Sequence, residues 1–225
     1  YTMTHEEWKE LIEYLNEESK TTPCILLNDI AYIDFSYDLE HSRDYMKQFE
    51  RISENVMVVI AMSCSKTCTS YGMRCGAAVI CAHSKESVRE AEIVFEKSAR
   101  ALWSNVNNGA MINFVRVVRD NNEAFMNEKQ SYIDLLRERS EIFYNEAKEV
   151  GLECYPYKEG FFVTLKMDNE LKVKYHEYLM QHNIFTVQVN KGIRVVGGCC
   201  GTTPEHIKSV KNIIDKSTFD EFKPK

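Results

Sequence analysis

Short apolar runs alternate with stretches of helical spacing along the first half of the chain. The runs, rich in β-branched residues, predict buried strands over residues 24–28, 56–62 and 76–81. Apolar residues at helical spacing predict helices over about 4–20, 41–53, 84–102 and 109–119. Strands that alternate with helices in this way are typical of the α/β class, with a mostly parallel sheet and flanking helices.

The predicted helix ends rest on capping residues. Thr4 and Glu7 form a capping-box pattern at the start of the first helix, and Ser84 precedes the third. On this third helix we expect a partial core face, made of Val88, Ala91, Ile93 and Phe95.

The pattern changes in the second half. A long charged helix is predicted from about 121 to 150 and ends at Gly151. A strand over 161–165, a helix over 170–181, strands over 184–189 and 193–196 and a last helix from Thr203 then suggest a small α+β domain. We therefore divide the chain into residues 1–120, part of a larger domain, and residues 121–225, a connecting helix followed by a small C-terminal domain.

Composition narrows the classes of function. The 225 residues carry a net charge of −6 with dispersed basic residues, which argues against a nucleic-acid partner. The sequence has no run near the ~20 consecutive apolar residues of a membrane span. Its eight cysteines include no C-x-x-C pair, so we expect reduced thiols in a cytoplasmic protein and no metal site.

The most informative segment follows the predicted strand over 56–62. Lys66 lies just past the strand end, where partial burial would favour a reactive neutral amine. The hydroxyls of Ser63 and Ser65 and the guanidinium of Arg74 form a set suited to one phosphate group. Taken alone, Lys66 would more often be a solvated loop residue.

The spacing of these residues favours a functional role for Lys66 over that of a solvated loop residue. The segment S-x-S-K, with an Arg eight residues after the Lys, resembles the cofactor-lysine segment of the fold-type I, class I/II aminotransferases, the aspartate and aromatic aminotransferase superfamily. The resemblance implies that Lys66 holds pyridoxal 5′-phosphate as a Schiff base and that Ser63, Ser65 and Arg74 contact its phosphate. If cations at this site lower their thiol pKa, then Cys64, Cys68 and Cys75 are expected to be reactive.

A second segment supports the resemblance. Residues 29–32 match the family's D-x-A-Y motif directly after a predicted strand. The resemblance implies that Asp29 pairs with the protonated pyridine nitrogen and that Tyr32 donates a hydrogen bond to the ring phenolate oxygen.

Two arginines are the candidates for substrate binding. Arg194, in a late predicted strand, matches the family's clamp on the substrate α-carboxylate. Arg100 lies in a stretch that resembles R-x-x-[YW]-S-N of aspartate aminotransferases, where the Arg binds a distal carboxylate. Trp103 in the same stretch leaves an aromatic substrate open, and Arg100 also suits a helix C-terminus electrostatically. Gly160, Phe161 and Phe162 resemble a turn that lines the substrate entrance, although a turn into a core strand explains them equally well.

The expected activity is therefore transamination in amino-acid metabolism, between an aspartate-like or aromatic amino acid and a 2-oxo acid. A C–S β-lyase of the same fold would use the same residues and stays open. The chain starts at a helix that, in the family, follows cofactor-binding segments absent here, so we expect a C-terminal half of the enzyme. A third reading is a folded but inactive fragment with a structural or dimerising role. The family resemblance implies a homodimer.

Overall fold

The computed structural model describes residues 3–158, 160–166 and 169–183. The predicted strands over 184–189 and 193–196, the last helix from Thr203 and the candidate Arg194 lie outside the described residues. Within the described ranges, no helix is long and apolar enough to cross a membrane.

The elements follow the predicted order closely. The strands are β1 (Cys24–Asp29), β2 (Val56–Ser63) and β3 (Gly76–Cys81). The α-helices are α1 (His5–Glu18), α2 (Cys64–Thr67), α3 (Lys85–Leu102), α4 (Asn108–Val115), α5 (Asn122–Glu149) and α6 (Asn169–Gln181). The described part of the chain also has three short 3₁₀ helices, η1 (Ile33–Phe35), η2 (Asp44–Arg51) and η3 (Tyr71–Met73), and a π-helical turn, η4 (Arg116–Asp120), which joins α4 to α5.

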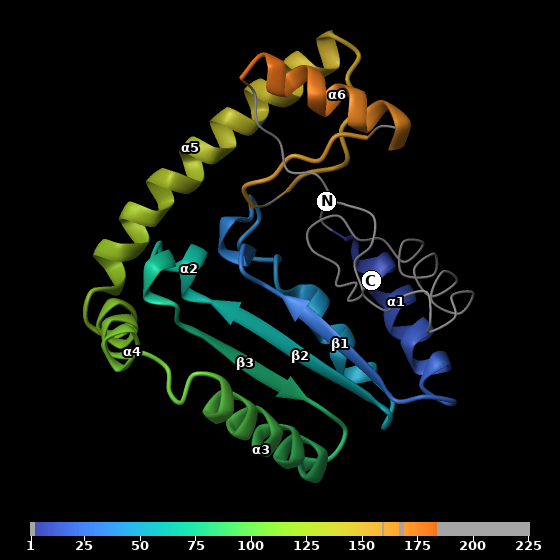
Figure 1. The fold of residues 1–225 in the computed structure, drawn as a ribbon, viewed down its shortest axis with the longest axis vertical. Coiled ribbons are helices and arrows are strands. Elements are labelled where there is room, and N and C mark those ends of the chain that lie inside the picture. The colour runs from blue at the N-terminus through green and yellow to red at the C-terminus, as the bar shows by residue number, and fades with distance from the viewer. Residues whose placement is uncertain (1–2, 159, 167–168, 184–225) are drawn as a thin grey trace, which may run out of the picture.

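The three strands of the described residues form one sheet in the order β1-β2-β3. The pair β1 and β2 is parallel and the pair β2 and β3 is antiparallel. The α/β class is confirmed, and the described part of the sheet is mixed, with one pairing of each kind. The carboxyl ends of β1 and β2 meet at one end of the sheet, and α5 passes beyond that end (Figure 1).

One face of this sheet carries the hydrophobic core. Val58 and Ile60 of β2 are buried against Ile12 of α1 and Phe49 of η2. Trp8 stacks on Tyr45 at a centroid distance of 4.4 Å and closes the cluster at its edge. Because side chains alternate along a strand, the odd-numbered residues of β2 lie on the opposite face.

Capping explains where two of the helices begin. The Thr4 hydroxyl accepts a hydrogen bond from Glu7 N at 3.2 Å, and the Glu7 carboxylate accepts one from Thr4 N at 2.7 Å. Ser84 Oγ accepts from Ser87 N at 3.0 Å at the start of α3. Both predicted caps are confirmed.

Three expectations about the elements were wrong in part. The segment predicted as a helix over 41–53 is the 3₁₀ helix η2, in which the Asp44–Lys47 ion pair (2.9 Å) joins side chains that a 3₁₀ turn superimposes. The strand predicted over 161–165 contributes a single bridge, between Leu165 and Cys154. Helix α3 contains no buried residue. It lies beside the edge strand β3 and does not cover a face of the sheet (Figure 1).

Candidate functional site

The candidate site is at the end of the sheet where β1 and β2 both terminate. Asp29, the last residue of β1, is in register with Ala61 of β2. Ser63, two residues beyond Ala61, lies on the same face of the sheet as Asp29. This face is opposite the core cluster, so the two predicted site residues share the side that the core leaves open.

A local turn connects Asp29 to Tyr32. The exposed Asp29 side chain accepts a hydrogen bond from Ala31 N at 3.0 Å, which is the geometry of an Asx turn. The chain then enters η1, with Tyr32 half-buried at its start. The turn therefore presents both residues of the D-x-A-Y motif at the strand end.

Lys66 lies in the single helical turn α2 that follows β2. Ser63 caps this turn by accepting a hydrogen bond from Ser65 N at 3.1 Å, and Cys64 is buried beneath it. Lys66 is half-buried, and its Nζ lies 5.9 Å from the ring centroid of Tyr32 and 4.8 Å from that of Tyr71. The fold thus brings Lys66 and Tyr32, from two adjacent strand ends, into contact range.

Arg74, which follows η3, contacts the same helical turn α2. Its Nη1 donates to Ser65 Oγ at 3.3 Å and to Tyr71 O at 2.9 Å. The Arg74 backbone adopts a left-handed conformation with φ of 52°, uncommon for a residue other than glycine. This backbone turn aims the guanidinium back at Ser65.

Tyr71 is a site residue that the sequence reasoning missed. Its ring lies under both cations, with Arg74 Cζ 4.9 Å and Lys66 Nζ 4.8 Å from its centroid. A ring face attracts a cation through its quadrupole, so Tyr71 stabilises both side chains near each other. The sequence did contain one sign of this role, because Tyr71 is an aromatic residue between Lys66 and Arg74, three residues before Arg74.

Glycine is required where β3 starts. Gly76 is in register with Ser63, and a Cβ at Gly76 would lie 2.5 Å from the backbone oxygen of Met62. The close approach of these two strands holds Ser63, and so the start of α2, at the strand end.

The segment from Gly160 to Phe162 packs against Tyr32. The rings of Phe161 and Phe162 meet the Tyr32 ring edge-on at centroid distances of 4.9 and 6.0 Å. Gly160, with φ of 86°, lies beside Tyr32, where a Cβ would be in ordinary van der Waals contact at 3.5 Å. The predicted entrance turn is therefore adjacent to the D-x-A-Y segment.

The structure does not bring every predicted residue to this cluster. Arg100 is exposed in the last turn of α3, and within the described residues it makes no hydrogen bond or ion pair. Arg194 lies outside the described residues.

The expectation of reactive cysteines at this site was wrong for Cys64 and Cys68. Burial raises the pKa of the Cys64 thiol to about 12, and burial also raises the pKa of Cys68. Both thiols are therefore protonated near neutral pH and act as small core residues. Within the described ranges, no three His, Cys, Asp or Glu residues are grouped to hold a metal ion.

The donor set of this cluster fits a phosphate-bearing pyridine aldehyde. Arg74 and the Ser65 hydroxyl present donors for a phosphate, and Ser63 keeps an O–H donor while accepting from Ser65 N. Lys66 supplies the amine, and Asp29 supplies a carboxylate on the open face. A phosphate group, an aldehyde and a ring nitrogen could therefore each find a partner here.

Comparisons with known proteins agree with this chemistry. The sequence pattern of the family described as "Aminotransferase class I and II" matches residues 1–213. A crystal structure of an aminotransferase from Anaerococcus prevotii superposes with a TM-score of 0.76 and 34% identity, over 93% of this chain and 51% of that one. The chain thus spans about half the length of that protein. A comparison with curated proteins found no match.

Two more distant solved structures share the fold. The aspartate aminotransferase of Plasmodium falciparum has a TM-score of 0.58 and 22% identity, over 94% of this chain and 51% of that one. The broad-specificity aminotransferase of Leishmania mexicana has a TM-score of 0.61 and 19% identity, over 82% and 45%.

Proposed function

Because the chain belongs to the class I and II aminotransferase family, we propose that it forms the lysine-bearing part of a pyridoxal-phosphate site for transamination. In this proposal an amino group moves between an amino acid, aspartate-like or aromatic, and a 2-oxo acid. Residues 1–120 belong to the cofactor-binding domain, and residues 121–225 form the connecting helix and a small C-terminal domain.

One observation carries the proposal. The Lys66 amine lies 5.9 Å from the ring centroid of Tyr32 and 4.8 Å from that of Tyr71, while Arg74 donates a hydrogen bond to the hydroxyl of Ser65 next to Lys66. An amine, an anion-binding pair and two tyrosine rings therefore lie close together at η1, α2 and η3. Chance surface placement rarely brings these groups together at the end of two parallel strands.

Each residue has a distinct role in this proposal. Arg74, Ser63 and Ser65 bind the cofactor phosphate, and Asp29 pairs with the protonated pyridine nitrogen. Tyr32 donates a hydrogen bond to the phenolate oxygen of the ring. Lys66 forms the covalent link to the cofactor.

Lys66 also serves as the acid and base of the reaction. When bound, the cofactor supplies an electron sink that stabilises negative charge at the substrate Cα. The Lys66 amine would move the proton from the substrate Cα to the carbon that carried the cofactor aldehyde, and in the second half-reaction it would move a proton back to Cα. Arg194 binds the α-carboxylate in a bidentate fork and so orients the Cα–H bond, and Arg100 binds a distal carboxylate when the substrate is dicarboxylic.

Cofactor capture at Lys66 tests this proposal directly. The purified chain is mixed with pyridoxal 5′-phosphate, treated with borohydride, and mapped by mass spectrometry. We expect a visible absorption band and a reduced pyridoxyl group at Lys66. Lys66→Met should abolish both signals, while the exposed Lys148→Met on α5 should leave both unchanged.

The distribution of the label decides the outcome. Labelling spread evenly over surface lysines, and unaffected by Lys66→Met, would contradict a cofactor site in this chain. If Lys66 is labelled, amino-group transfer that requires an added 2-oxo acid supports transamination. Release of pyruvate and ammonia from a β-substituted amino acid without any oxo acid would instead identify a β-lyase.

A further inference from the structure

Helix α5 carries a buried cation that the proposed chemistry does not use. The Lys129 side chain is 4% exposed, and its Nζ donates to Asp34 Oδ2 at 2.9 Å. Asp34 belongs to η1, and its other oxygen accepts a charge-assisted hydrogen bond from Arg43. The ion pair thus joins two segments that are 95 residues apart in sequence.

The surroundings of Lys129 specify its position closely. Its Nζ lies 5.8 Å from the ring centroid of Phe35 and 5.6 Å from that of Phe125. An ammonium without water pays a large desolvation cost unless its partners are well placed. The carboxylate and the two ring faces together meet this need, so displacement of η1 from α5 would leave a buried charge unpaired.

The tethered segment is the one that carries the candidate cofactor contacts. Asp34 and Phe35 belong to η1, the short helix that starts directly after Tyr32. The Phe35 ring meets Phe161 at 4.8 Å, and Phe161 meets Tyr32 at 4.9 Å, both edge-on. A continuous set of packed groups therefore runs from Lys129 to the tyrosine that faces Lys66.

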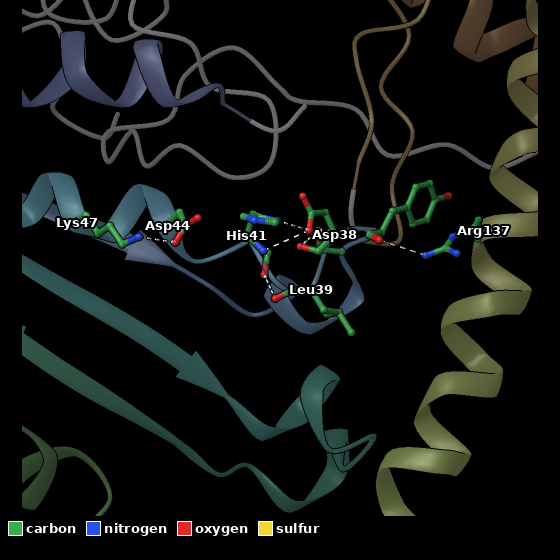
Figure 2. Close-up of polar contacts among 9 residues, drawn as sticks. Asp38, Leu39, His41, Asp44, Lys47 and Arg137 are labelled. Atoms are coloured by element: carbon green, nitrogen blue, oxygen red, sulfur yellow. Dashed lines mark hydrogen bonds and ion pairs between the residues drawn. The ribbon is translucent and has the colours of Figure 1, made fainter.

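A second contact between α5 and this segment lies further along the helix, at Arg137. Arg137 Nη2 donates to Tyr37 O at 3.4 Å, and its guanidinium lies 4.7 Å over the Tyr37 ring. The Tyr37 hydroxyl also hydrogen-bonds to Ser140 of α5. Figure 2 shows Arg137 reaching this carbonyl beside the Asp38–His41 pair. Segment 33–37 is thus held to one helix at both of its ends.

We propose that Lys129 is a positioning residue of the cofactor site, which acts through its ion pair with Asp34 to hold Tyr32 over the Lys66 amine. This inference rests on the function proposed above, since it assigns Tyr32 and Lys66 to one site.

The first test uses the chain without cofactor. The rate of reductive methylation of each lysine is measured by mass spectrometry, with the other lysines as internal references. Lys129→Met should raise the relative rate at Lys66 severalfold, because Tyr32 no longer covers the amine. Lys148→Met makes the same substitution at an exposed position of the same helix and should leave the Lys66 rate unchanged.

A second variant separates positioning from stability. Lys129→Met leaves the Asp34 carboxylate with one cationic partner and can weaken folding. The pair Lys129→Met with Asp34→Asn removes both charges, and urea unfolding shows whether the chain is as stable as the original. We expect the Lys66 rate to stay raised in this double variant even where stability recovers.

Three results are informative. An unchanged Lys66 rate in a folded Lys129→Met chain would overturn the inference. So would a Lys66 rate that returns to the original value in parallel with stability in the double variant. Failure of the original chain to capture pyridoxal 5′-phosphate would contradict the proposed function, whereas the cofactor-free labelling would still report whether Lys129 positions Tyr32.

Discussion

At the scale of single residues, the close approach of β3 to β2 next to the site requires a residue without a side chain, Gly76. Gly76→Ala should lower the free energy of unfolding by about 1–3 kcal/mol, because the new Cβ meets the rigid backbone oxygen of Met62. Urea unfolding followed by circular dichroism measures the change. Gly72→Ala is the matched control, since no atom lies within 4 Å of a Cβ there. An equal effect of both substitutions would refute the steric explanation.

Single residues also differ in how well the sequence predicts them. Asp29, Lys66 and Arg74 could be proposed as site residues because their spacing within short segments matches known motifs, and because Asp29 and Lys66 lie at or just past the end of a recognisable strand. Tyr71 and Lys129 were not, since their importance depends on what lies opposite them in space. The partner of Lys129 is 95 residues away in sequence, and the local pattern of residue types does not reveal such a contact.

At the scale of elements, the start of α1 tests how much a capping box contributes. Thr4→Ala removes the hydroxyl that accepts from Glu7 N, and we expect a loss of about 1 kcal/mol in the free energy of unfolding. Thermal or urea unfolding provides the measurement. Thr4→Ser keeps the acceptor oxygen and should retain most of the stability. A Thr4→Ser chain as unstable as Thr4→Ala would show that the methyl group, and not the cap, is responsible.

Elements with strong local signals were predicted well, and elements with weak signals were not. The three strands and the long helix α5 have continuous apolar runs or extended helical spacing with clear ends. Gly151, with φ of 73°, follows α5 as the capping pattern predicts. The segment over 161–165 is apolar enough for a strand, but its aromatic side chains pack on Tyr32 and Phe35 instead of joining a ladder.

At the scale of the whole molecule, much apolar surface on α3, α4 and the turn between them is exposed. Leu102 and Trp103 are 73% and 63% exposed, and several more apolar side chains of this surface are at least 40% exposed, namely Val94, Phe95, Val106, Met111, Ile112 and Val115. Many exposed apolar side chains on two successive helices are typical of an interaction site or an aggregation hazard.

We therefore expect the isolated chain to self-associate. A variant with Leu102→Glu and Trp103→Glu should stay dispersed at concentrations where the original chain forms larger species, as measured by light scattering. Val150→Glu alters a residue that is 78% exposed at the end of α5, away from this surface, and should change association little. Equal dispersal by Val150→Glu would point to net charge as the cause.

The sheet shows what the sequence leaves undecided at this scale. The α/β class follows from the alternation of strands and helices, yet the direction of β3 does not. A parallel strand needs a crossover connection, usually with a helix. Residues 64–75 contain two short single turns, α2 and η3, which return the chain antiparallel. These turns form around the candidate site and have no strong periodic signal.

The left-handed backbone of Arg74 has a consequence for the engineering of this chain. An arginine in that conformation carries conformational strain that glycine would relieve. Selection for heat resistance alone would therefore favour glycine at position 74, and the guanidinium beside Ser65 would be lost with it. Thermostable variants of this chain should thus be screened for ligand capture as well, since the two properties compete at this one position.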